Sequence, residues 1–409
     1  MKKPVTRGII TGSHHREFSE EAMKTMNAMK VEFSYLPRQF RQARRGEDPS
    51  RFYTDRIIDD IRNFVETGDF TLGEKLEEFE SKFSELIGVK HSIGVNSGTD
   101  ALILSLKALG IGPGDEVITC AETFIATAGA IAATGATPVF VDVNDQFIID
   151  VDLIEQAITD RTRALLPVWF TGNAPDMTRI NEIAMRYGIP VVEDSCCAID
   201  AAIDGKKAGS FGITGTFSFH PLKNLNVWSD GGMITTNSDL MNEKLRLLRN
   251  HGLVNRDEVA VFGVNSRLDT IQAVVALGMI DDVASITDRR IANAGVLDRA
   301  FSELAGCIEV PSRAPNVRHV YHLYMVRAKD RDNLLKHCIE NGVEAKVHYP
   351  IPLPYQQCCR HLGYKRGDFP KTERDCGSII TFPAHQHLTD EELHYIIGVV
   401  RAFYGDNQR

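Results

Sequence analysis

The sequence lacks the features that would place it outside the soluble globular class. No apolar run reaches the roughly 18–20 residues that a membrane-spanning helix needs. The N-terminal stretch MKKPVTRGIITGSHHREFSEE has no apolar segment of the kind that secretory signals contain. There is no internal repeat, no low-complexity segment and no long basic run, and the formal net charge is −9. A nucleic-acid-binding role, which requires a basic face, is therefore not expected.

Cysteine spacing excludes two further classes. Four of the eight cysteines form the adjacent pairs Cys196–Cys197 and Cys358–Cys359, which is poor geometry for disulfides. No CxxC repeat predicts a zinc site, and the spacing of CCRH (358–361) does not suit a metal. We therefore expect no metal and a reducing, cytoplasmic environment.

What the chain does contain is typical of a globular enzyme-sized protein. Its 409 residues are 43% apolar and 25% charged, and at roughly 150 residues per domain they suggest two or three domains. From about residue 85, short continuous apolar runs alternate with helical periods. The predicted strands are HSIGV, VITC, TPVFVDV, RALLPVWF and IPVVED. This alternation predicts an α/β fold with a parallel sheet that is covered by helices on both faces.

The pattern changes after Gly215. TFSFH and GGMITTN are predicted strands, and SRLDTIQAVVALGMIDD (266–282) is predicted to be a helix long enough to cross between domains. The last part of the chain, which includes an expected strand at VEAKVHYP (343–350), indicates a small α+β domain. We predict an N-terminal arm over residues 1–48, a large domain over 49–285 and a small domain over 286–409.

Two motifs at predicted strand ends carry candidate chemistry. NSGTD (96–100) lies between a strand and a helix start, where backbone amides and hydroxyls can hold a phosphate; simple helix capping explains it equally well. VVEDS (191–195) places two carboxylates at the end of a buried strand, the edge where open α/β sheets bind ligands. One of these acids could pair with a cationic ring nitrogen, or it could cap a helix.

Two further motifs follow. TFSFHPLKNLN (216–226) ends a strand with Ser218 and Lys223. An enclosed lysine can form an imine, although a loop lysine is far more often a solvated surface group. FGVNSRLDTIQA (262–273) is a polar turn that leads into a helix, and capping alone would account for it.

Taken together and in this order, the motifs describe one site. It consists of a phosphate-binding helix start, an aromatic residue after a strand (Phe124), an aspartate at a strand end (Asp194) and a lysine 29 residues further along (Lys223). Pyridoxal 5′-phosphate requires such a lysine, an acid for its pyridine nitrogen, phosphate donors and a stacking partner. The sequence therefore predicts a pyridoxal 5′-phosphate site.

From about residue 50 to its C-terminus the chain resembles the DegT/DnrJ/EryC1/StrS family of sugar aminotransferases. The resemblance rests on many segments in a fixed order: GDFTLGEKLEEFESKFSELIGVKH, NSGTDAL, GPGDEVI, GATPVFVDV, VVEDS, FSFHPLKNL, DGGMITT, RNHG, GVNSRLDTIQA and VHYPIPL. It implies the aspartate aminotransferase type I fold, with a large domain that contains a mostly parallel seven-stranded sheet and a small C-terminal α+β domain. It also implies a homodimer with a shared active site.

The resemblance implies a role for individual residues of this sequence. Lys223 corresponds to the lysine that carries the cofactor, Asp194 to the partner of its pyridine nitrogen and Phe124 to the residue that stacks on its ring. The implied phosphate contacts are Gly98, Thr99, Ser218 and, from the neighbouring subunit, Asn265. His348 corresponds to a histidine that can face the sugar, although a strand-end structural histidine fits as well.

The sequence departs from the family at three places. Cys197 replaces the glutamine that usually follows three residues after the aspartate, and a thiol is a weaker hydrogen-bond partner. The loop after the lysine contains Trp228, which would either narrow the pocket or pack as a structural residue. The arm over residues 1–48 is longer than usual.

The implied activity is transfer of an amino group from glutamate or glutamine to a keto sugar. A nucleotide-linked 3- or 4-keto-6-deoxyhexose is expected, with a keto sugar phosphate or a cyclitol as alternatives. A sugar 3-dehydratase of the same fold would generally carry His in place of Lys223. A non-catalytic regulator that binds cofactor or DNA is a further alternative, against which the acidic net charge counts.

Overall fold

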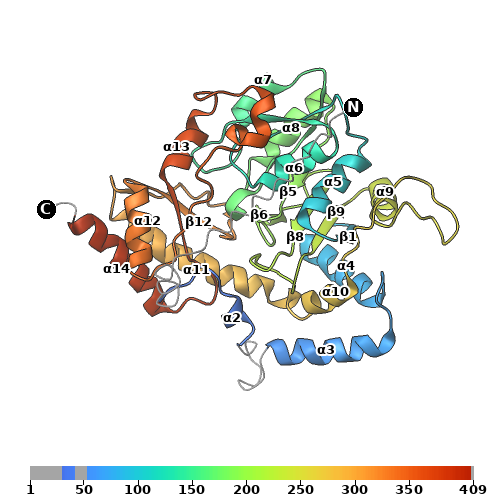
Figure 1. The fold of residues 1–409 in the computed structure, drawn as a ribbon, viewed down its shortest axis with the longest axis horizontal. Coiled ribbons are helices and arrows are strands. Elements are labelled where there is room, and N and C mark those ends of the chain that lie inside the picture. The colour runs from blue at the N-terminus through green and yellow to red at the C-terminus, as the bar shows by residue number, and fades with distance from the viewer. Residues whose placement is uncertain (1–29, 42–52, 407–409) are drawn as a thin grey trace, which may run out of the picture.

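The computed structural model describes residues 30–41 and 53–406. Most of the predicted N-terminal arm lies outside these residues, and its described part, 30–41, contains the short helix α2 (Leu36–Gln39). Figure 1 shows the two lobes of the molecule, with α2 between them and the C-terminus at the far end of the smaller lobe.

A seven-stranded sheet forms the centre of the large lobe. Two smaller sheets, with strand orders β3-β2-β4 and β5-β8-β9-β1, are joined by parallel bridges from Leu165 to Val191 and from Val168 to Asp194. The strands are β1 (His91–Val95), β2 (Glu116–Cys120), β3 (Thr137–Val141), β4 (Thr162–Leu165), β5 (Val192–Asp194), β8 (Thr214–Ser218) and β9 (Gly232–Thr236). Neighbours pair in parallel except β9, which is antiparallel to both β8 and β1. The expected mostly parallel sheet is thus confirmed.

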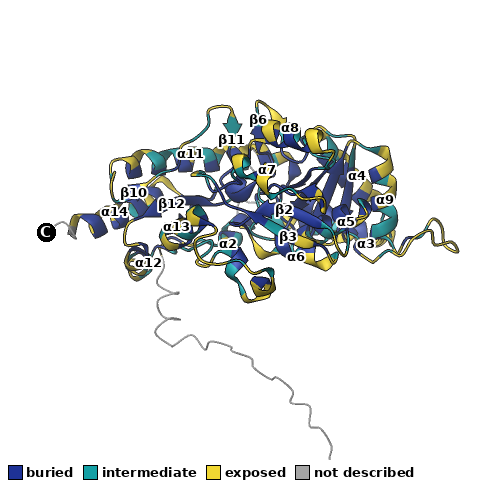
Figure 2. Ribbon diagram, turned by 90° about the horizontal axis from the view of Figure 1, so that it is seen from above, coloured by how far each residue is buried: buried dark blue, intermediate teal, exposed yellow. Residues whose placement is uncertain are grey.

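Helices cover this sheet. They are α3 (Tyr53–Thr67), α4 (Glu74–Ile87), α5 (Gly98–Ala108), α6 (Ile125–Ala133), α7 (Ile154–Ala157), α8 (Met177–Tyr187), α9 (Asp239–Arg249) and α10 (Thr270–Leu277). Every residue of β2 and β9 is buried, so both faces of the sheet are covered, and Figure 2 shows exposed residues mainly on the outer helices. The continuous apolar runs in the sequence reflect this double burial.

The small lobe is built on an antiparallel sheet of β10 (Ile308–Glu309), β12 (Tyr324–Ala328) and β13 (Ile379–Phe382). Its helices are α11 (Val283–Ser302), α12 (Arg331–Glu340), α13 (Pro370–Ser378) and α14 (Asp390–Asp406). A minor sheet of β6 (Ala202–Ile203), β7 (Lys206–Lys207) and β11 (Val317–Arg318) links the lobes. The predicted domain boundary at 285/286 falls within the first turn of α11.

Two local predictions were wrong. The predicted helix 266–282 begins only at Thr270 and ends at Leu277, and the crossing between lobes in Figure 1 is made by α11 instead. The predicted strand 343–350 makes only isolated bridges, from Val343 to Val31 and from Lys346 to Thr381. Pro350, which has no N–H to donate, ends its extended course.

One helical stretch of the described chain, Thr270–Ser302, is long and apolar enough to cross a membrane by composition. Of the 18 consecutive residues that are most apolar in this stretch, 56% are buried inside the protein. It therefore serves as a core helix of a folded domain, which explains its composition without a membrane.

Candidate active site

A cavity of about 360 Å³ opens at the carboxyl ends of β5 and β8, where the two lobes meet. This is the sheet edge at which open α/β folds bind ligands. Three parts of the chain contribute to its lining. These are residues 97–99, 123, 124, 126, 127, 194, 196, 197, 218, 220, 222 and 223 of the large lobe, residues 321–324, 348–349 and 382–385 of the small lobe, and Phe33 and Tyr35 of the arm.

The two carboxylates at the end of β5 have different surroundings because successive side chains of a strand point to opposite faces. Glu193 is fully buried and accepts hydrogen bonds from Trp169 Nε1 and from the backbone amides of Gly209, Phe211 and Gly212. Burial raises the pKa of Glu193, although these donors partly oppose the rise. Glu193 therefore holds the following loop in place, and it is the other acid that faces the cavity.

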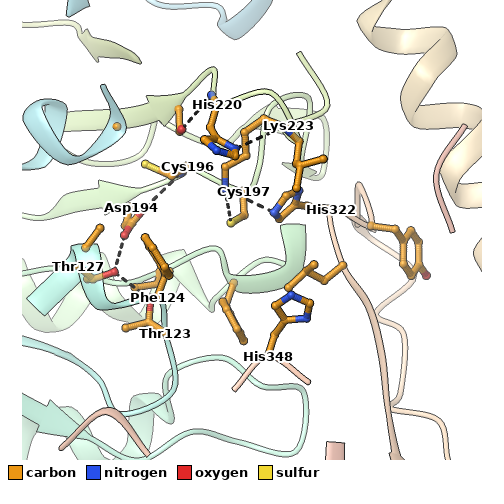
Figure 3. A pocket seen from close by; sticks show the side chains of 18 of the residues that line it. Thr123, Phe124, Thr127, Asp194, Cys196, Cys197, His220, Lys223, His322 and His348 are labelled. Carbon is orange, nitrogen blue, oxygen red and sulfur yellow. Dashed lines mark hydrogen bonds between the residues drawn. The ribbon is translucent and has the colours of Figure 1, made fainter. Parts of the chain in front are cut away.

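Asp194 is the acid at the cavity, and its orientation is fixed by hydrogen bonds. Thr127 Oγ1 donates to its Oδ2 over 2.7 Å, and the Cys196 amide donates to its Oδ1 over 3.2 Å. Thr123 Oγ1 lies 2.9 Å from Thr127 Oγ1 and extends the network (Figure 3). Because α6 begins at Ile125, Thr127 lies in the first turn of that helix, and this turn therefore supplies the hydroxyl that orients the Asp194 carboxylate.

The loop that carries Lys223 follows β8, and the side chains at the end of this strand point alternately into the core and toward the cavity. Phe217 and Phe219 point into the core, where their rings meet Phe83 at 5.1 and 5.5 Å between centroids. Ser218, between them, lines the cavity. The lysine side chain then turns into the same cavity from the loop after the strand, as Figure 3 shows.

The amine of Lys223 contacts two residues. Its Nζ donates to Cys197 Sγ over 3.2 Å and lies 3.4 Å from His322 Nε2. Burial lowers the pKa of Lys223, but Cys197, Cys196 and Asp194 oppose this, and the pKa lies above its ordinary value. Burial also lowers the pKa of His322 well below its ordinary value. At neutral pH the lysine is thus a cation beside a neutral imidazole that can accept a hydrogen bond from it.

The N-terminus of α5 forms the part of the cavity wall beside Ser218 and Cys196. A Cβ added to Gly98 would lie 2.8 Å from Ser218 Cβ and 2.9 Å from Cys196 Sγ, so only glycine permits this close approach. Gly98 and Thr99 are the first residues of α5 and line the cavity together with Ser218. A helix N-terminus with free amides and adjacent hydroxyls is a ready-made site for an anion such as phosphate.

Phe124 and His348 line the remaining walls. The Phe124 side chain is 52% exposed in this single chain and stands at the N-cap of α6, with its ring 6.0 Å from that of Tyr349. His348 Nδ1 lies 2.9 Å from Thr381 Oγ1. Burial, with Lys346 and Lys223 nearby, lowers the pKa of His348 to about 4. The histidine is therefore neutral at physiological pH.

Two residues singled out from the sequence lie elsewhere. Asn265 is exposed, outside the cavity lining, and pairs through its backbone with Asn250. Trp228 does not line the cavity but packs edge-on against Phe40 at 5.7 Å between centroids. Trp228 therefore packs as a structural residue and does not narrow the pocket. The loop turns its ring into the apolar cluster beneath α10.

Sequence reasoning missed several residues that the fold brings to the cavity. Thr127 stands three residues after Phe124 and carried no motif of its own. His322 lies in a strand-like apolar run, HVYHLYMVRA, in which neither of the two histidines gives a signal. Phe33 and Tyr35 belong to the arm, whose contacts with the cavity join residues far apart in the chain. Among the residues that the structure describes, no group of three or more His, Cys, Asp or Glu side chains could hold a metal ion.

Comparison with known proteins places this geometry in a family. The sequence profile of the DegT/DnrJ/EryC1/StrS aminotransferase family matches residues 53–401. The chain is 39% identical to a pleiotropic regulatory protein of Geobacillus stearothermophilus, covering 85% of this chain and 94% of that protein. It is also 39% identical to a dTDP-3-amino-3,4,6-trideoxy-alpha-D-glucose transaminase of Streptomyces venezuelae, covering 83% and 90%.

Solved structures agree with the sequence comparison. The fold matches that of S. venezuelae DesV in complex with a ketimine intermediate, with a TM-score of 0.82 and 38% identity over 86% of this chain and 94% of that one. The fold is that of the type I pyridoxal-phosphate-dependent aminotransferases, as the resemblance implied. The chain belongs to the DegT/DnrJ/EryC1/StrS aminotransferase family.

Proposed function

We propose that this aminotransferase uses pyridoxal 5′-phosphate to move an amino group from glutamate or glutamine to a keto sugar during amino-sugar biosynthesis. The observation that carries the proposal is the convergence on one cavity of a lysine amine, an oriented carboxylate and a helix N-terminus. The acceptor that we favour is a nucleotide-linked 3- or 4-keto-6-deoxyhexose. The similar S. venezuelae transaminase is named for a dTDP-linked 3-amino sugar, and this name supports the choice.

The residues present fit the cofactor. Gly98 lets the start of α5 lie close against Ser218, and Gly98 and Thr99, whose amides belong to the first turn of a helix and have no partner within it, line the cavity as a phosphate requires. Asp194 supplies an acid for a ring nitrogen, and Phe124 supplies an exposed aromatic face. Lys223 supplies the amine. When bound, the cofactor provides an electron-withdrawing ring that stabilises negative charge at the reacting carbon.

The protein's own residues then perform the acid–base work. Thr127 and the Cys196 amide keep Asp194 in position to hold a proton on the ring nitrogen. Lys223 Nζ removes the α-proton of the donor amino acid and, in the second half-reaction, donates a proton to the sugar carbon that gains the amine. His322, neutral and 3.4 Å from Nζ, can accept a hydrogen bond from the protonated lysine between these steps.

The proposed assembly is a homodimer in which Asn265 reaches the phosphate site of the partner subunit. In Figure 1 the segment between α9 and α10 projects away from the large lobe. It carries exposed apolar side chains at Val259, Val261, Phe262 and Val264, and that of Phe262 is fully exposed. Apolar side chains of this kind would be buried by a second copy of the chain. We further propose a cytoplasmic location, which is consistent with eight free cysteines.

An absorbance spectrum of the cofactor-loaded protein tests the proposal. We expect a visible band that L-glutamate abolishes and that a keto-sugar acceptor restores. Borohydride reduction followed by peptide mass mapping should place the cofactor on the peptide that contains Lys223, and Lys223→Ala should lack both signals. Screening nucleotide-linked keto sugars against keto sugar phosphates and cyclitols identifies the acceptor class. A protein that shows no band after incubation with the cofactor would refute the cofactor assignment.

Mixing two inactive variants tests the shared site. Lys223→Ala and Asn265→Ala, each inactive alone, should regain activity when co-refolded, because a hybrid dimer contains one intact site. A monomeric mass in solution would contradict this arrangement.

A further inference from the structure

A short segment of the arm crosses from the small lobe to the lysine loop. We call residues 31–40 the strap. At one end, Val31 pairs with Val343, and the Phe33 amide donates to Glu344 Oε2 over 2.7 Å. Arg38 makes a two-pronged contact with Glu392 at the start of α14, at 2.8 and 2.7 Å. The strap is thus fastened to the small lobe along most of its length.

The other end of the strap is fastened to the loop of Lys223. Gln39 is buried and exchanges hydrogen bonds with Asn226, 3.1 Å in each direction. Phe40 packs edge-on against Trp228. The strap therefore ties the lysine loop of the large lobe to the small lobe, and it does so beside the cavity.

Tyr35, in the middle of the strap, acts on the lysine itself. Its hydroxyl donates to the backbone carbonyl of Lys223 over 3.0 Å, and Asn226 Nδ2 donates to the same oxygen over 3.0 Å. Burial raises the pKa of Tyr35, so the hydroxyl stays protonated and remains a donor. The ring is held by Arg290, whose guanidinium carbon lies 5.2 Å from the ring centroid, and by His385 at 5.1 Å between centroids.

Phe33 forms part of the cavity wall on the small-lobe side. Its ring lies 5.7 Å from that of His348, and Lys346 Nζ lies 4.7 Å from its centroid. These neighbours belong to the small lobe, whereas Asp194 and the start of α5 line the cavity from the large lobe. A group that occupies the cavity beyond the lysine would meet this ring.

The strap lies outside the part of the chain that the family profile describes, which begins at residue 53. We propose that the strap is an active-site element of this enzyme, in which Tyr35 positions Lys223 and Phe33 forms a wall for the keto-sugar acceptor. This inference rests on the proposed function, because it assigns roles within that reaction. It adds two residues to the site that sequence motifs and the family profile do not provide.

Replacement of Tyr35 by Phe tests the positioning role. Tyr35→Phe keeps the ring and removes one of two donors to the Lys223 carbonyl, so the rate of the glutamate half-reaction should fall about three- to tenfold. The affinity for glutamate should remain unchanged. The pH midpoint of the visible band should also move by about half a unit, because the lysine is less firmly held.

Tyr404→Phe is the matched control. Its hydroxyl also donates to a lysine carbonyl, that of Lys329 over 2.8 Å, but in the small lobe away from the cavity. This variant should lose similar thermal stability and leave the rate and the band unchanged. Equal behaviour of the two variants would overturn the positioning role.

Replacement of Phe33 tests the acceptor wall. Phe33→Ala should weaken binding of the keto sugar about tenfold, as measured by the acceptor KM and by direct titration of the amine-loaded enzyme, with the glutamate half-reaction unchanged. Phe33→Leu, which keeps apolar bulk, should recover most of the affinity. A Phe33→Ala variant with wild-type acceptor affinity would overturn the wall assignment.

The response of the wild-type spectrum to glutamate distinguishes failure of the proposed function from failure of the strap assignments alone. If glutamate fails to abolish the band of the wild-type enzyme, the proposed function fails and the strap assignments fail with it. If the wild type responds but Tyr35→Phe matches Tyr404→Phe and Phe33→Ala matches wild type, the strap has no role in the site and only this inference fails. If Tyr35→Phe does not fold, Arg38→Gln provides a second test, because it removes the contact with Glu392 that fastens the strap outside the cavity. Arg38→Gln should also lower the rate of the glutamate half-reaction. An unchanged rate would count against the proposal.

Discussion

The hydroxyl of Thr127 donates a 2.7 Å hydrogen bond to Oδ2 of Asp194. The two residues are 67 positions apart in the sequence, yet the start of α6 and the end of β5 meet at the same edge of the sheet. A carboxylate that must pair with a ring nitrogen gains from such a restraint, because a rotation of the acid would break the pair.

Removal of this restraint should reduce catalysis without damaging the fold. Thr127→Val, which preserves shape, should lower the rate of the glutamate half-reaction about tenfold, the equivalent of one hydrogen bond to a charged group. Thr119→Val is a matched control, because Thr119 is also buried and donates to the Leu166 carbonyl over 2.8 Å. Stopped-flow absorbance should detect a slower reaction only for Thr127→Val, and equal rates for both variants would contradict the assignment.

Replacement of either neighbouring acid of β5 by its amide should affect a different property, catalysis for one acid and stability for the other. Asp194→Asn should lower the rate by about a hundredfold or more, because an amide cannot hold a proton on the ring nitrogen. Glu193→Gln should instead lower the free energy of unfolding by about 1–3 kcal/mol, because it weakens the bonds to Trp169 Nε1 and three backbone amides. Single-turnover kinetics and urea denaturation measure the two effects. A purely kinetic effect of Glu193→Gln would be inconsistent with its position.

The thiols of the site should resist alkylation. Burial raises the pKa of Cys197 and raises that of Cys196 well above its ordinary value, and only the thiolate is a good nucleophile. Cys358 is exposed. Treatment with iodoacetamide at pH 7 and peptide mass mapping should therefore label Cys358 long before the Cys196–Cys197 peptide. Labelling of that peptide at the same rate as Cys358 would contradict the burial argument.

Stability should fall as the solution is acidified below about pH 6.5. Burial lowers the pKa of His385 to about 3 and those of His387 and His348 to about 4. The unfolded chain binds protons at these histidines below about pH 6.5, while the folded chain does not, so the stabilisation present above that pH is lost as pH falls toward 4. Each histidine should cost about 1 kcal/mol between pH 6.5 and 5.5.

Denaturant midpoints measured across this range test the prediction. His387→Gln should reduce the slope of stability against pH, because it removes one of the titrating groups. A midpoint that stays constant or rises between pH 6.5 and 5.5 would show that these histidines are already protonated in the folded protein.

Much of the large lobe could be predicted because its determinants are local. HSIGV and EVITC are short apolar runs between helical periods, and such runs form strands wherever the sheet is covered on both faces. The candidate site was predictable for the same reason. Asp194 and Ser218 end neighbouring parallel strands, in which Asp194 is opposite Thr216, so strand order alone brings them to one edge.

Predictions failed where pairing between distant segments decides the structure. The alternation in VEAKVHYP suggested a strand, but the strap occupies the position beside Val343 and a proline ends the run. The helix predicted from residue 266 starts late because Ser266 is used elsewhere, with its hydroxyl donating to Asp100 Oδ2 over 2.7 Å. Neither contact leaves a trace in local periodicity.

The sequence by itself determined the order of the strands and helices along the chain and the family, and it predicted the candidate lysine and aspartate, because motif spacing and hydrophobic periodicity are properties of neighbouring residues. Only the tertiary structure decided that Glu193 is bonded to Trp169 and to backbone amides while Asp194 faces the cavity, that Thr127 and His322 join the site, and that Tyr35 reaches the Lys223 carbonyl from 188 residues away. These contacts depend on how lobes and strands pack. Such long-range packing is set by the whole core and cannot be read from any single stretch of the chain.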